Sequence, residues 1–144
     1  MAAPAAVSSP APADDGAAAM DRAQLLEDLR ILAADEMEGR LVATPGSERA
    51  RAYIIARFEA IGLEPIGETY LSGFEFGRPN GWSPTTTGIN IIGRLRGTSE
   101  SPRVMVVSAH YDHMGKRGGG TGNGADDNAS GVAALLATAA SFAA

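Results

Sequence analysis

Residues 104–113 read Val-Met-Val-Val-Ser-Ala-His-Tyr-Asp-His, and this stretch decides the predicted fold. Residues 104–107 form a continuous apolar run, which is typical of a strand buried on both faces of a sheet. Because residues two apart face the same way along a strand, a strand over 104–109 that continues slightly would project His110 and Asp112 together from its carboxyl end. Open α/β sheets place their ligands at that end. The stretch therefore predicts a buried strand that carries a functional site.

Two helices are predicted upstream of this strand. The first covers residues 21–34, where Asp21 is placed as N-cap, Gln24 completes a capping box, and leucines repeat at helical spacing. The second begins at Thr44-Pro45 and ends before Gly62, because Thr caps helices, Pro is tolerated at the first helical position and Gly terminates them. The apolar face of the second helix consists of Ala50, Tyr53, Ile54, Phe58 and Ile61.

Further elements follow from the rest of the pattern. Residues 69–76 and 89–95 predict two strands, residues 115–124 a glycine-dense loop, and residues 129–142 a helix rich in Ala and Leu. The order helix, helix, strand, strand, strand, helix indicates the α/β class, with layers around a mixed sheet. Three aromatic residues either line a substrate pocket or form an apolar cluster under a long loop: Phe74, Phe76 and Trp82.

Composition limits the possible partners. The 144 residues carry a net charge of −5 and no block of Lys or Arg, which argues against a nucleic-acid-binding face. The chain has no Cys, so a metal would be held by His and carboxylates, a donor set that suits zinc or a similar divalent ion. No apolar stretch approaches the roughly 20 residues that span a bilayer, so no membrane-spanning segment is expected.

The first 20 residues differ from the rest, because residues 2–19 are nearly all Ala, Pro, Ser and Gly. This segment lacks the basic and Leu-rich regions of a complete signal peptide, but Ala11-Pro12-Ala13 resembles the end of a cleavage site. Two interpretations stay open: part of an export signal that starts further upstream, or a flexible tail. We therefore divide the chain into a leader, 1–20, and a domain, 21–144, and we expect export to the periplasm or the medium.

A second motif, Gly124-Ala125-Asp126-Asp127-Asn128-Ala129-Ser130-Gly131, precedes the final helix. One explanation is helix capping, because acidic and small polar side chains are favoured at a helix N-terminus. The other is metal binding together with His110, one of only two histidines in the chain. A ligating imidazole usually gives its other N–H to a carboxylate or carbonyl, a role that suits Asp112. Taken together, the two motifs and the glycine loop between them favour a metal site.

These motifs resemble the co-catalytic di-zinc metallopeptidases of peptidase family 28, a group of bacterial aminopeptidases and their relatives. The specific similarity lies in residues 106–115 and 124–136, and the resemblance as a whole covers about residues 25–144. Supporting segments are residues 32–35, 39–40, 44–46, 53–54 and 90–93. Ala43 departs from the family pattern, in which a Gly is common. The resemblance implies a three-layer α/β/α sandwich with a mixed sheet.

The resemblance also implies a role for each site residue. His110 matches a ligand of one zinc ion, and Asp127 matches the carboxylate that bridges both ions. Asp112 matches the carboxylate that orients His110 for catalysis, whereas Asp126 and His113 match family positions that are not ligands. In the family, a metal-bound water attacks the N-terminal peptide bond of a peptide substrate. The implied function is therefore a zinc-dependent exopeptidase of the aminopeptidase kind, with two Zn²⁺ ions.

The family takes its general-base Glu and further Glu, Asp and His ligands from sequence that lies downstream of the second motif. None of the residues after Asp127 is Glu, Asp or His. We therefore expect a domain that is truncated in its C-terminal part and keeps about half of the ligands of each zinc. Such a chain should have no useful peptidase activity alone and should tend to aggregate.

Two other interpretations stay open. The chain could be a non-catalytic remnant or binding module with at most weak metal binding. More remotely, Gly120-Thr121-Gly122-Asn123-Gly124-Ala125 has the form of a dinucleotide-binding fingerprint, although about ten residues separate it from the strand that it should follow directly. No pattern in the sequence indicates the oligomeric state.

Overall fold

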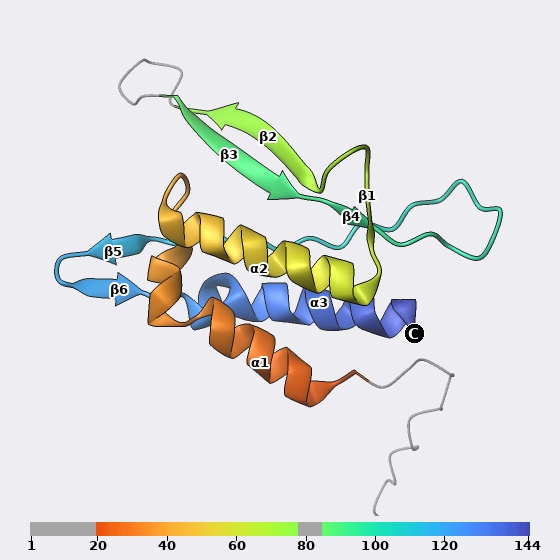
Figure 1. Ribbon diagram of the computed structural model, residues 1–144, viewed down its shortest axis with the longest axis horizontal. Coiled ribbons are helices and arrows are strands. Elements are labelled where there is room, and N and C mark those ends of the chain that lie inside the picture. The colour runs from red at the N-terminus through yellow and green to blue at the C-terminus, as the bar shows by residue number, and fades with distance from the viewer. Residues whose placement is uncertain (1–19, 78–84) are drawn as a thin grey trace, which may run out of the picture.

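The computed structural model describes residues 20–77 and 85–144, which form helices and short antiparallel sheets (Figure 1). The helices are α1 (Arg22–Leu32), α2 (Pro45–Ile61) and α3 (Ser130–Ala143). A 3-10 helix, η1 (Asp35–Arg40), follows α1, and a π-helical turn, η2 (Ala125–Ala129), precedes α3. The predicted α/β class is confirmed at this level.

The helix boundaries follow from local chemistry. The Asp21 carboxylate caps α1, because it accepts hydrogen bonds from the backbone N–H groups of Ala23 and Gln24 at 2.9 and 3.0 Å. Thr44 Oγ1 accepts from the backbone N–H of Ser47 at 3.4 Å and caps α2. Gly62 ends α2 with a φ of 86°, a left-handed conformation that glycine adopts without strain. Both predicted upstream helices are confirmed.

The core lies between the helices. Helix α3 runs beside α2 and also packs against α1 (Figure 1). The buried apolar cluster consists of Leu32, Met37, Ala50, Ile54, Phe58, Leu63, Ala129, Val132 and Leu136. The apolar face that the sequence predicts for α2 therefore does face the core.

Asp28 on α1 is fully buried between α1 and α2 although it is charged. Its Oδ1 accepts hydrogen bonds from the Tyr53 hydroxyl at 2.6 Å and from Gln24 Nε2 at 3.0 Å, and Arg57 Nε lies 2.9 Å away. Burial raises the pKa of Tyr53 above its ordinary value, and the hydrogen bond to Asp28 raises it further by a smaller amount. A polar network therefore ties α1 to α2 inside an otherwise apolar contact.

The strands form three two-stranded antiparallel sheets in the described part of the chain. The pairs are β1 (Glu64–Pro65) with β4 (Gly93–Arg94), β2 (Leu71–Phe76) with β3 (Thr86–Ile91), and β5 (Gly115–Arg117) with β6 (Gly120–Gly122). The predicted strand over residues 69–76 is present as β2, whereas the predicted strand over residues 89–95 is divided between β3 and β4, which belong to different sheets. Strands β5 and β6 form a hairpin where the sequence predicts a loop. Since these residues contain no continuous mixed sheet, the three-layer sandwich is not confirmed.

The prediction of a buried strand over residues 104–109 is wrong. The segment pairs with no strand in the described residues, and the side chains of Val104 and Val106 are 84% and 81% exposed. The physical reason is that an extended segment becomes a strand only when a neighbour satisfies its backbone N–H and C=O groups. Instead, Val106 shares the lining of a largely apolar cavity of about 580 Å³ with Ile89 and Ile91 of β3.

Among residues 20–77 and 85–144, no helix has both the length and the apolar character needed to cross a bilayer. Two predictions fall largely or wholly outside the described residues: the leader, of which only Met20 is described, and the pocket role of Trp82.

Candidate functional site

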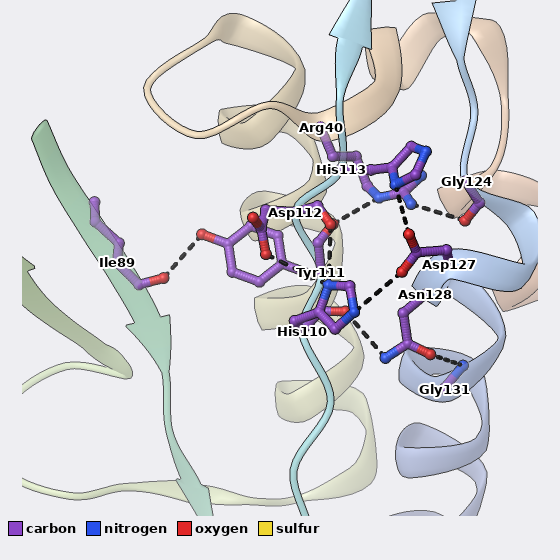
Figure 2. Close-up of polar contacts among 10 residues, drawn as sticks. All are labelled: Arg40, Ile89, His110, Tyr111, Asp112, His113, Gly124, Asp127, Asn128 and Gly131. Atoms are coloured by element: carbon purple, nitrogen blue, oxygen red, sulfur yellow. Dashed lines mark hydrogen bonds and ion pairs between the residues drawn. The ribbon is translucent and has the colours of Figure 1, made fainter. Parts of the chain in front are cut away.

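The two sequence motifs meet where the segment that links β4 to β5 passes the start of α3 (Figure 2). His110, Asp112 and His113 come from this segment, and Asp127 comes from η2. The segment is not a paired strand, yet it brings His110 to Asp127 as the metal-site prediction requires.

The carboxylate of Asp127 lies between two imidazole rings. Its Oδ1 is 3.2 Å from His110 Nε2, and its Oδ2 is 3.3 Å from His113 Nδ1. The side chain of His113 is only 9% exposed, whereas those of His110 and Asp127 are 54% and 67% exposed. Asp127 therefore offers one oxygen to each ring, at the edge of the solvent.

The contacts of His110 Nδ1 bear on whether Nε2 of the same ring is available to bind a metal. His110 Nδ1 lies 3.1 Å from the backbone carbonyl oxygen of Asp112 and 3.5 Å from Oδ1 of the Asp112 carboxylate. With a proton on Nδ1 directed at this carbonyl, the ring would present the lone pair of Nε2 to Asp127, which is the tautomer that metal ligation through Nε2 requires. The backbone of Asp112 is thus closer to His110 than the carboxylate that the resemblance implies for this task. The role of the carboxylate stays a prediction.

This arrangement fits a divalent cation. The lone pair of Nε2 and a carboxylate oxygen repel each other at 3.2 Å unless a proton or a cation lies between them. Two ligands of a tetrahedral zinc, each about 2.0–2.2 Å from the ion, are roughly 3.3–3.6 Å apart. The N···O distances of 3.2 and 3.3 Å around Asp127 lie near the lower end of that spacing. Imidazole and carboxylate are also usual donors for zinc.

The donor set is nevertheless small. Across the described ranges, 20–77 and 85–144, no three His, Cys, Asp or Glu side chains converge on a point that could hold a metal ion. Each oxygen of Asp127 faces one ring, so each side of the carboxylate offers two protein donors. A catalytic zinc normally has three protein ligands and a water. The residues present therefore suit weak metal binding better than a tight catalytic site.

The capping interpretation of the second motif applies to a different residue. Asn128 Oδ1 accepts a hydrogen bond from the backbone N–H of Gly131 at 3.2 Å, so the amide of Asn128 satisfies the first turn of α3. A Cβ on Gly131 would lie 2.2 Å from that same oxygen, which explains why a glycine follows at this position. Asp127 instead directs its carboxylate at the two imidazole rings. Helix capping therefore does not account for Asp127.

Arg40, to which the sequence assigned no role, is fully buried next to the site. Its guanidinium donates hydrogen bonds to the carbonyl oxygens of Tyr111 at 2.6 Å and Gly124 at 2.9 Å (Figure 2). It also donates to the carbonyl oxygens of Asn123 at 2.7 Å and of Leu32. Burial lowers the pKa of Arg40. The negative charges of Asp112 and Asp127 counteract that shift. A sequence pattern could not reveal this role, because every partner of Arg40 is a backbone carbonyl.

Glycines around the site make room for its packing. A Cβ on Gly124 would lie 2.7 Å from the ring of His113, and a Cβ on Gly39 would lie 2.4 Å from the carbonyl oxygen of Gly122. Gly39 and Gly124 also have φ values of 67° and 57°, which side chains rarely adopt. Among the glycines of the proposed dinucleotide fingerprint, Gly124 is therefore explained by packing without a bound nucleotide.

The apolar cavity of about 580 Å³ reaches the site at one end, where His110 and Asp112 line it. Phe74 and Phe76 of β2 line the same cavity, with ring centroids 5.8 Å apart. Both roles suggested for these two aromatic residues are therefore compatible with their position.

One protein-family model matches part of the chain. Residues 90–144 match the model of Peptidase family M28. No curated protein and no solved structure matches the chain. The matched residues run from the end of β3 through the segment with His110 to the end of α3, so they include His110, Asp112, His113 and Asp127. The predicted resemblance is confirmed over this stretch, which supports a peptidase-type hydrolase.

Proposed function

From the peptidase family M28 segment at residues 90–144, we propose that the chain carries part of the catalytic site of a zinc-dependent exopeptidase of the aminopeptidase kind. The observation that carries the proposal is the contact of His110 Nε2 with Asp127 Oδ1 at 3.2 Å. In the tautomer with its proton on Nδ1, directed at the Asp112 carbonyl, His110 would offer Nε2 and Asp127 would offer Oδ1 to a shared cation.

Each residue then has a defined task. His110 and Asp127 would hold a zinc ion, and the second carboxylate oxygen of Asp127, which faces His113, would be available to a second ion. Asp112 holds the ring of His110 through its backbone carbonyl, and its carboxylate adds negative charge beside the ring. Bound zinc would act as a Lewis acid that polarises the peptide carbonyl and makes a water molecule more acidic. The apolar cavity beside His110 would shield an apolar part of a peptide substrate from water.

Three finer points belong to the same proposal. The complete domain would have the three-layer α/β/α sandwich with a mixed sheet that the family resemblance implies. The complete site would hold two zinc ions. The leader would direct the protein out of the cytoplasm.

The small donor set favours a second candidate for these 144 residues by themselves, namely a binding module with weak metal affinity and no catalysis. The observation behind it is that no three donors converge in the described residues. Both candidates share the zinc ligands His110 and Asp127 and differ only in turnover.

Zinc binding by the wild-type chain and by His110→Ala tests the site assignment. We expect the wild-type chain to bind Zn²⁺ in competition with a chromophoric chelator and His110→Ala to lose that binding. The side chain of His110 is 54% exposed, so the variant should keep its fold by circular dichroism. Unchanged zinc affinity in a folded His110→Ala variant would show that the site is misassigned.

The same preparations separate the two candidates. We expect no turnover of an aminoacyl chromogenic substrate by the zinc-loaded wild-type chain, because each ion has too few protein ligands. Measurable turnover that depends on His110 would overturn the binding-module candidate and support a catalytic site within these residues.

A further inference from the structure

Arg40 links the two segments that carry the metal donors. Tyr111, whose carbonyl oxygen accepts from Arg40 Nε at 2.6 Å, lies between His110 and Asp112 in the chain. Gly124, whose carbonyl oxygen accepts from Nη2 at 2.9 Å, begins the loop that contains Asp127. Figure 2 shows the guanidinium between these two segments, on the side of His113. The planar guanidinium of Arg40 therefore connects the segment of His110 to the loop of Asp127.

The contacts of Arg40 are specific to a guanidinium. It uses Nε and both terminal nitrogens, and every acceptor is a backbone carbonyl whose position depends on the path of the chain rather than on a side-chain rotamer. A lysine ammonium is a point charge on a flexible stem and cannot reproduce this planar arrangement of donors. The loss of even part of the arrangement should therefore let the two segments move relative to each other.

The charge of Arg40 has a second consequence. Its positive charge attracts both Asp112 and Asp127, yet neither carboxylate hydrogen-bonds to the guanidinium. The carboxylate of Asp127 thus keeps both oxygens free to face the imidazole rings, while a buried cation behind it limits the repulsion between the two aspartates. Arg40 supports the site electrostatically without occupying a donor atom.

We propose that Arg40 is a positioning residue of the metal site, which holds the segment of His110 and the loop of Asp127 at the spacing that a shared zinc ion requires. The proposal rests on the proposed function, because it needs His110 and Asp127 to bind metal. Removing a group that orients a metal ligand typically lowers metal affinity by about 10- to 100-fold.

The first test compares Arg40→Lys with Arg49→Lys. Arg49 is a suitable control because its Nε also donates to a backbone carbonyl, that of Glu36 at 2.6 Å, without touching a site segment. We expect folded Arg40→Lys to bind Zn²⁺ about 10- to 100-fold more weakly than the wild-type chain, and Arg49→Lys to bind it with wild-type affinity. Wild-type affinity in a folded Arg40→Lys variant would overturn the proposal.

A second measurement uses the wild-type chain and decides the matter if Arg40→Lys does not fold. If Arg40 improves zinc binding, zinc must stabilise the contacts of Arg40 by the same factor. Hydrogen exchange of Arg40 Nε–H, followed by NMR, should therefore become slower on zinc binding, whereas exchange of Arg49 Nε–H should not change. An arginine with a purely structural role would slow only as much as the backbone amides that exchange through global unfolding. An Arg40 exchange rate that slows no more than the rates of those amides would overturn the proposal.

The outcomes separate this proposal from the proposed function. If the wild-type chain binds no zinc, the proposed function fails and the role of Arg40 fails with it. If the chain binds zinc through His110 but either test gives the result that overturns the role of Arg40, only that role fails.

Discussion

Replacement of Asp127 with alanine is expected to abolish measurable zinc binding while leaving the fold intact. Asp127 provides both oxygens that face the imidazoles, so its loss leaves His110 and His113 as isolated single donors. Removal of a direct ligand should cost more than the roughly 10- to 100-fold lost when a group that only orients a ligand is removed. Isothermal titration with Zn²⁺ measures the loss. The fold should persist because the side chain of Asp127 is 67% exposed.

Asp126→Ala is the matched control. Asp126 is adjacent, exposed and equally charged, and its backbone carbonyl, not its carboxylate, accepts a hydrogen bond from Ser130 Oγ at 3.1 Å. We expect Asp126→Ala to bind zinc like the wild-type chain. If both variants lost the same amount of zinc affinity, local negative charge rather than ligation would explain the binding. If both lost thermal stability instead, the capping interpretation would be restored.

Replacement of Asp28 with alanine is expected to destabilise the fold by about 3–5 kcal/mol, the cost of breaking a buried ion pair by removing one partner. The side chain of Asp28 is 1% exposed and that of Arg57 is 18% exposed, so solvent cannot fully replace the lost carboxylate. The hydroxyl of Tyr53 would lose its acceptor as well. Since domains of this size are stable by about 5–15 kcal/mol, the variant should be close to unfolding at room temperature. Urea denaturation followed by circular dichroism measures the change.

Glu27→Ala is the control on the same helix. Glu27 pairs with Arg30 at 2.6 Å, but both side chains are largely exposed, so water and salt screen the pair. We expect its urea midpoint to stay near that of the wild-type chain. An Asp28→Ala midpoint as close to wild type as that of Glu27→Ala would show that the buried network does not hold α1 against α2.

The helices could be predicted from the sequence because their signals are local. Asp21, Thr44 and Gly62 act on neighbours within a few residues, and each occupies the predicted cap. The conformation of residues 104–109 could not be predicted in the same way. A strand depends on a partner that the local pattern does not specify, and the strand predicted here has none in the described residues. An apolar run predicts burial, but here the run borders a cavity that it shares with β3.

The site was predictable in part for a similar reason. The histidine and aspartate motifs bring His110 and Asp127 together across a glycine hairpin, as their types and order suggest. The contact of His113 with Asp127 was not foreseen, although the nearby glycines that accommodate its ring were visible in the sequence. The roles of Arg40 and Asp28 could not be predicted, because nothing in a sequence pattern indicates that a charged residue at a helical or loop position is buried.

The most direct test of the metal site is the ¹⁵N NMR spectrum of the two histidine rings during a zinc titration of the wild-type chain. The predicted result is a saturable change of the His110 Nε2 resonance, with the proton retained on Nδ1, because Nδ1 contacts the Asp112 carbonyl. A His110 ring that does not respond to saturating zinc, or that binds zinc through Nδ1, would contradict the assignment of His110 and Asp127 as the metal ligands.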